Sequence, residues 1–194
     1  MGYPYSNGDV LSHSDMNAVG LHLVTPTSVT GGTLSGATVT IGSAVSSVAV
    51  VDAFSSTFDN YLIMVRINST SGGPYIQMRM GATSTTDYWG SLVTADYLGN
   101  ASGSGDNGDT EWGYVGAGHS SGTSSFSVEV RSPHLASRTM VSSNYVDPNP
   151  VNGARAGTFN GFLNNTTSYD DFTFLVSTGT MSGGEIRVYG YSNG

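Results

Sequence analysis

One stretch of the chain indicates the fold most directly: Ser125-Phe126-Ser127-Val128-Glu129-Val130-Arg131, in which polar and apolar residues alternate without a break. Successive side chains of a β-strand point to opposite faces, so the three apolar residues would share one buried face. The segment 75–80 alternates in the same way, with its isoleucine and two methionines pointing inward. Each segment therefore predicts a strand that packs one face on a hydrophobic core.

Outward from these two segments, the chain after Pro26 contains ten or eleven short strand patterns separated by Gly- and Ser-rich turns. They are 37–41, 47–51, 61–67, 75–80, 87–93, 111–116, 125–131, 138–143, 156–163, 171–176 and 185–191. Strand 61–67 is apolar on both faces, which is typical of a central strand. No helical pattern separates the strands. The pattern predicts an all-β fold, an antiparallel, jelly-roll-like β-sandwich over residues 31–194.

The composition excludes several kinds of site and partner. The 194 residues include no cysteine, so disulfides, thiolate metal sites and a cysteine nucleophile are excluded. The net charge is −8 and all six basic residues are arginine, which argues against nucleic acid and against an anionic membrane surface as partners. No apolar segment is long enough to span a membrane and no secretory signal is evident, so we expect no membrane insertion.

The first thirty residues differ from the rest and are predicted to form an N-terminal attachment arm, 1–30. Within it, Ser12 to Gly20 has the capping residues of one short helix. A helix of two turns is not stable alone in water, so the arm must pack on the body of the protein or on a neighbouring subunit. Its candidate apolar anchors are Leu11, Met16, Val19, Leu21 and Leu23.

No motif for catalysis or for a metal centre is present. The four histidines form no HxH, HxxxH or HExxH arrangement, and no GxSxG elbow occurs. Asp170 and Asp171 are adjacent and would point to opposite faces of a strand, which favours a solvated strand entry over the paired carboxylates of a glycan-cleaving enzyme. We therefore predict no catalytic residue, no metal ligand and no cofactor.

The acidic segment from Ser104 to Glu111 is the densest group of carboxylates in the chain. Asp106, Asp109 and Glu111 are oxygen ligands of the kind that Ca²⁺ takes on flexible loops. The segment lacks the spacing of an EF-hand loop, and Gly, Asn and Asp also form ordinary turns. The turn is the favoured interpretation, and a cation at this loop is left open.

Both tryptophans lie in aromatic segments next to a carboxylate and a glycine, Asp87-Tyr88-Trp89-Gly90 and Glu111-Trp112-Gly113-Tyr114. Sugar rings stack on aromatic side chains, and their hydroxyl groups donate hydrogen bonds to carboxylates. Two interpretations follow: a glycan-binding or receptor-binding platform, or large aromatics that fill the core, which is the commoner role. The candidate platform residues are Asp87, Tyr88, Trp89, Trp112 and Tyr114.

Three segments resemble tail fibres and minor tail proteins of tailed bacteriophages. Ser6-Asn7-Gly8-Asp9-Val10-Leu11 followed by Asp15-Met16-Asn17-Ala18 is similar to the "NGDVL…DMNA" opening of that family, and 53–63 resembles its "F…YdnYli" strand. The closing segment 169–191 resembles its "sGtmsGgtirVYGY" ending. The resemblance implies a β-sandwich or jelly roll, assembly as a homotrimer and an N-terminal segment attached to the particle. It offers no catalytic residues.

These observations lead to one expectation and two rivals. We expect a non-enzymatic virion structural protein, a tail fibre or minor tail component, whose partners are other virion proteins and a glycan on the host surface. It would assemble in the host cytoplasm and then be extracellular on the virion. The rivals are a capsid decoration or head-fibre protein and a glycan-cleaving enzyme. Between protomers, carboxylates would pair with the strand arginines Arg66, Arg79, Arg131 and Arg187.

Overall fold

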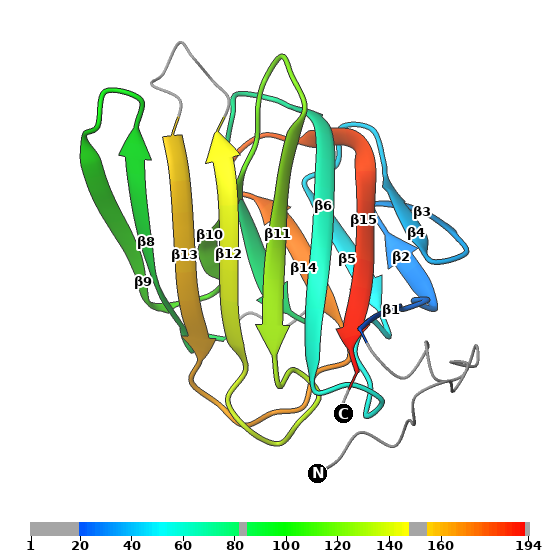
Figure 1. Cartoon of the computed structure of the whole chain (residues 1–194). Helices are drawn as coiled ribbons and strands as arrows, with labels where there is room; N and C mark the ends of the chain where they lie inside the picture. The colour runs from blue at the N-terminus through cyan, green and yellow to red at the C-terminus, as the bar shows by residue number, and fades with distance from the viewer. Residues whose placement is uncertain (1–19, 82–84, 148–154, 193–194) are drawn as a thin grey trace, which may run out of the picture.

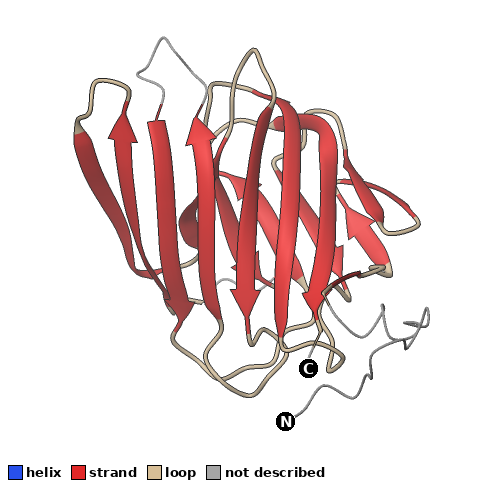
Figure 2. Cartoon of the chain, viewed as in Figure 1, coloured by secondary structure: helices blue, strands red, loops and turns tan. Residues whose placement is uncertain are grey.

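The computed structural model describes residues 20–81, 85–147 and 155–192, which form two antiparallel β-sheets packed face to face (Figure 1). The strands are β1 (Leu21–Leu23), β2 (Ser28–Thr30), β3 (Gly32–Ser35), β4 (Thr38–Ile41), β5 (Ser47–Val51), β6 (Asn60–Thr70), β7 (Tyr75–Met80), β8 (Tyr88–Asp96), β9 (Ala101–Asp109), β10 (Trp112–Ala117), β11 (Ser124–Arg131), β12 (Met140–Asp147), β13 (Arg155–Leu163), β14 (Phe172–Val176) and β15 (Met181–Tyr191). Figure 2 shows strands and loops but no helix in these ranges. Accordingly, no described residue belongs to a helix that could cross a membrane.

The strand order is that of a jelly roll with added strands. The large sheet runs β3-β4-β15-β6-β11-β12-β13-β8-β9, with β1 paired to β15, and the small sheet runs β10-β7-β14-β5-β2. From β5 to β14 the chain passes repeatedly from one sheet to the other, as it does in a jelly roll. The meander β11-β12-β13 takes the place of a single jelly-roll strand. The predicted all-β, jelly-roll-like sandwich is confirmed.

The core lies between the sheets and follows from the alternation in the sequence. Phe126, Val128 and Val130 of β11 are buried as predicted, and β6 is a central strand between β15 and β11. The small sheet contributes Phe172 and Phe174 of β14, whose rings meet edge to face at 5.2 Å. Burial of such aromatic side chains is the main favourable contribution to the stability of the fold.

Four strands were not predicted from the sequence. Two of them, β1 and β2, lie in the predicted arm. β1 pairs with β15 of the large sheet, and β2 pairs with β5 of the small sheet. The described part of the arm therefore belongs to the two sheets, where Leu21 and Leu23 are about half exposed on β1. The predicted helix and its anchors Leu11, Met16 and Val19 lie outside the described residues.

Each of the four strand arginines contacts a carboxylate of its own chain. Arg131 contacts Glu129 at 2.7 Å on its own strand, and Arg187 contacts Glu185 at 3.0 Å in the same way. Arg66 also contacts Glu185 from the neighbouring strand, and Arg79 contacts Glu111. Residues two apart on a strand share a face, so both same-strand pairs follow from the spacing in the sequence.

Candidate functional site

A polar cleft of about 490 Å³ lies at one edge of the sandwich, where β9 of the large sheet approaches β10 of the small sheet. Strands β7, β9 and β10 and the turn between the last two supply most of its lining. The residues that matter most below are Tyr75, Gln77, Asp106, Asp109, Glu111 and Tyr114.

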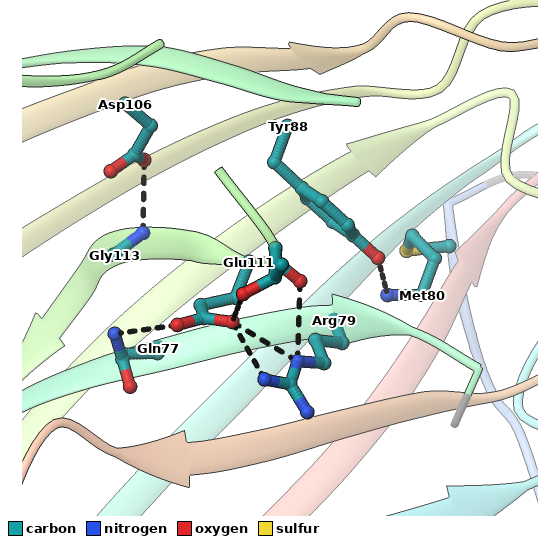
Figure 3. Close-up of polar contacts among 8 residues, drawn as sticks. Gln77, Arg79, Met80, Tyr88, Asp106, Glu111 and Gly113 are labelled. Atoms are coloured by element: carbon teal, nitrogen blue, oxygen red, sulfur yellow. Dashed lines mark hydrogen bonds and ion pairs between the residues drawn. The ribbon is translucent and has the colours of Figure 1, made fainter. Parts of the chain in front are cut away.

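One side of the cleft is held by a hydrogen-bonded group centred on Glu111 (Figure 3). Arg79 donates to Glu111 Oε2 from Nη2 at 2.7 Å and from Nε at 3.2 Å. Gln77 Nε2 donates to Oε1 at 3.3 Å, and the Thr110 hydroxyl donates to Oε2 at 2.6 Å. Although burial opposes ionisation, the hydrogen bonds from Thr110 and Arg79 and the charge of Arg79 lower the pKa of Glu111 below its usual value.

Asp106 ties the edges of the two sheets together. It lies on β9 with only 7% of its surface exposed, and its Oδ2 accepts a hydrogen bond from the Gly113 N–H of β10 at 2.9 Å (Figure 3). Burial raises the pKa of Asp106 to about 6, and the hydrogen bond from the Gly113 N–H lowers it in part. The negative charges of Asp109 and Glu111 raise this pKa further. The residue therefore changes charge near neutral pH.

Replacing Asp106 with asparagine is expected to stabilise the protein at high pH and not at low pH. Asparagine keeps an oxygen acceptor for Gly113 and removes the charge. Because the folded pKa is raised from 3.8 to about 6, the folded state binds more protons than the unfolded state, and native stability falls as pH rises through that interval. The gain should approach about 3 kcal/mol above the folded pKa and vanish below the unfolded pKa.

Urea unfolding of both proteins at pH values on either side of that interval measures this difference. Asp59→Asn is the matched control, because it makes the same substitution at an exposed position outside the cleft. A stability gain for Asp106→Asn that is the same at every pH would contradict the assignment.

Two tyrosines form an aromatic part of the cleft lining. The rings of Tyr75 and Tyr114 meet edge to face with centroids 4.9 Å apart, and both side chains are partly buried. Tyr114 also packs against Phe159 of the core at 6.4 Å. The cleft thus sets a fixed pair of aromatic rings near carboxylate and amide groups, the residue types that hold a sugar between a CH-binding surface and hydroxyl acceptors.

The structure separates the residues of the predicted glycan platform. Trp112 is fully buried and meets Tyr88 edge to face at 5.1 Å. The Tyr88 oxygen accepts the Met80 N–H at 2.8 Å, and burial raises the pKa of Tyr88 to about 12 (Figure 3). Both side chains are buried, so neither can form part of a surface platform. For Trp112 the core interpretation is the correct one.

The remaining platform residues lie in three different places. Trp89 is 37% exposed on the outer face of the large sheet, where its ring lies parallel to Phe162 with centroids 6.4 Å apart. Asp87 accepts a hydrogen bond from Asn165 Nδ2 at 3.2 Å. Of the five, only Tyr114 lines the polar cleft.

The predicted acidic loop is mostly a strand. Residues 104–109 continue β9, which pairs with β8, so the turn interpretation was wrong for this part of the segment. Asp106 points toward β10 and Glu111 holds Arg79, so both carboxylates have partners within the protein. Arg79 balances the charge of Glu111, whereas the partner of Asp106 is a neutral N–H group.

A second group of carboxylates lies at the far end of the small sheet. Oxygen atoms of Asp52, Asp170 and Asp171 lie within 4.8 Å of one another, so Asp170 and Asp171 do not diverge as predicted. Asp171 Oδ1 accepts the Asp52 N–H at 2.8 Å, and the Thr27 hydroxyl donates to Asp52 Oδ2. Asp52 has a φ of 56°, and these contacts hold the end of β5 in that conformation.

No protein-family model matches the chain, and no curated protein matches its sequence. The geometry of the cleft and the resemblance of the three sequence segments are therefore the features that indicate a function.

Proposed function

We propose that this chain is a non-enzymatic virion structural protein of a tailed bacteriophage, a tail fibre or minor tail component. Its N-terminal arm would attach to the particle, and its sandwich would bind a glycan on the host surface through the polar cleft. The observation that carries the binding proposal is the Tyr75–Tyr114 pair set near the Asp106, Asp109 and Gln77 side chains. The virion assignment rests on the sequence resemblance.

The cleft suits a neutral sugar. Three carboxylates line it, and the guanidinium of Arg79 balances that of Glu111. The remaining negative charge would repel an acidic sugar, whereas hydroxyl groups of a neutral sugar can donate to carboxylates and amides. The tyrosine rings offer the apolar surface that the CH groups of a sugar ring require.

The paired carboxylates favour binding over cleavage. The pKa of Asp106 is raised and that of Glu111 is lowered, as in the acid–base pair of a glycan-cleaving enzyme, so that rival function must be considered. Glu111, however, already accepts four hydrogen bonds, and Asp106 already accepts the Gly113 N–H. These groups hold the cleft together. Release of reducing ends from a bound polysaccharide would overturn the non-enzymatic proposal.

Binding to a panel of immobilised neutral bacterial polysaccharides tests the cleft. Tyr75→Ala removes half of the aromatic pair and should weaken binding by about tenfold or more, as truncation of a central aromatic contact commonly does. Tyr97→Ala is the matched control, because that ring is 72% exposed outside the cleft. Thermal unfolding establishes that each variant is folded. Unchanged binding by folded Tyr75→Ala would refute the assignment.

The position on the particle separates the tail from the capsid. Antibody labelling of purified virions should mark the tail if the chain is a fibre or minor tail component. Label spread over the head would instead establish the capsid decoration or head-fibre role, with the same fold.

A further inference from the structure

The outer face of the large sheet carries a shallow groove that runs across the strands. Two hollows of about 460 and 620 Å³ share Ser125 and Asn144 in their linings, so they are continuous. Their lining residues come from β15, β6, β11, β12, β13, β8 and β9, which are neighbours in the large sheet (Figure 1). Seven neighbouring strands span roughly 29 Å, which is long enough for several sugar residues in an extended chain.

This face is positively charged although the chain is acidic. Outward positions of the described strands of the large sheet carry Arg66, Arg131 and Arg187 with only two acidic residues, Glu129 and Glu185. Arg138 adds a fourth guanidinium over the Phe162 ring, at 5.9 Å from its centroid. The outward strand positions thus carry a net charge of +1, with the Arg138 guanidinium beside them, on a chain with a net charge of −8.

The excess charge in the groove lies at one end. Arg66 and Arg187 both contact Glu185, at 3.6 and 3.0 Å, so two guanidinium groups share one carboxylate. Their side chains are about half exposed, and both line the groove. Arginine binds carboxylate and phosphate groups through parallel N–H donors, so this end is suited to an anionic group.

The remainder of the groove suits a carbohydrate chain. Hydroxyl and amide groups of Ser125, Asn144 and Thr158 lie on three adjacent strands, and the exposed apolar side chains of Met64 and Val93 lie on the strands to either side. A peptide that extends a sheet needs free backbone groups at an edge. Here the ligand would cross the face, where the backbone groups are paired with neighbouring strands and only side chains are offered.

We infer that this groove binds an extended anionic glycan, whose carboxylate or phosphate groups contact Arg66 and Arg187. A nucleic acid carries a charge on every residue and would be opposed by the net charge of the chain. The inference goes beyond the proposed function, because the groove and the polar cleft are separate sites of opposite charge. Variants of one leave the other unchanged, so the two proposals fail independently.

Calorimetric titration of the full chain tests the inference, with polygalacturonate as the carboxylate probe, phosphomannan as the phosphate probe and dextran as the neutral probe. We expect binding of at least one anionic probe, weakening with added salt, and no binding of dextran. Arg66→Gln combined with Arg187→Gln should weaken binding by about tenfold or more. Arg131→Gln, on the same face but outside the groove, is the control and should bind as the native chain does.

Several outcomes would overturn the inference. These are failure of both anionic probes to bind, equal binding of dextran, or binding that survives the double substitution. Equally tight binding of a single-stranded DNA oligonucleotide would show a general attraction for polyanions. Sedimentation that shows a native oligomer, dissociated by the double substitution, would mean that a second copy of the chain covers this face. Exposed ion pairs contribute little to stability, so the double variant should remain folded.

Discussion

Trp112→Ala is expected to lower the free energy of unfolding by about 3–5 kcal/mol, a large part of the roughly 5–15 kcal/mol that holds a domain folded. Trp112 is fully buried between the sheets, and its ring packs against that of Tyr88. Its indole N–H also donates to the Phe162 carbonyl at 3.4 Å, a long hydrogen bond that links β10 to β13. Alanine would leave a cavity that the packed aromatic neighbours cannot fill.

Trp89→Ala is the matched control, because it removes the same side chain from the outer face of the large sheet, where Trp89 is partly exposed. It should cost no more than about 1 kcal/mol. Urea unfolding followed by circular dichroism measures both variants without relying on tryptophan fluorescence. Equal losses for the two substitutions would contradict the placement of Trp112 in the core and Trp89 on the surface.

Gly184→Ala is expected to have an effect at least as large, about 4 kcal/mol or more, and to reduce the yield of folded protein. Gly184 lies on β15 opposite Ile67 of β6, with a φ of 111° that side chains rarely permit. A Cβ atom there would lie 2.0 Å from the Arg66 carbonyl oxygen. The two central strands of the large sheet would have to separate.

Gly36→Ala separates the effect of backbone conformation from that of the clash. Gly36 has a φ of 56° in the turn between β3 and β4, and no atom lies within 4 Å of the position of a Cβ. It should cost only about 1–2 kcal/mol, the strain of a left-handed residue. The comparison is made by thermal unfolding of both variants. A Gly184→Ala protein as stable as Gly36→Ala would show that β15 and β6 are not held so closely.

The sequence predicted the strands that have longer alternating, β-branched or aromatic runs, and it missed β9 and the strands of three or four residues, β1, β2 and β3. In β9, Gly, Ser, Asp and Asn replace the β-branched and aromatic residues of a typical strand, so its segment was interpreted as a turn. The inward and outward positions of β7 were predicted correctly. Gln77 and Glu111 nevertheless meet only because β7 pairs with β10, a contact between distant segments that no local pattern reveals.

The two tryptophans show the limit of the sequence for the site. Each lies between a carboxylate and a glycine, and the segments therefore suggested one common role. Strand β8 has apolar side chains on both faces, including Trp89 and Val93 outward and Leu92 inward, so alternation does not assign its buried face. Which tryptophan is buried depends on the packing of the second sheet, which lies outside any local window of sequence.

The composition of β9 has a consequence for solubility. β9 is the last strand of its sheet, paired on one side with β8, so its other side presents unpaired backbone groups. Such an edge is a template on which other chains can add strands and aggregate. Glycine, which weakens strands, and the charge of the exposed Asp109 make β9 a poor template. The glycine and polar residues that made β9 hard to predict from the sequence thus also disfavour edge-to-edge association of the folded protein.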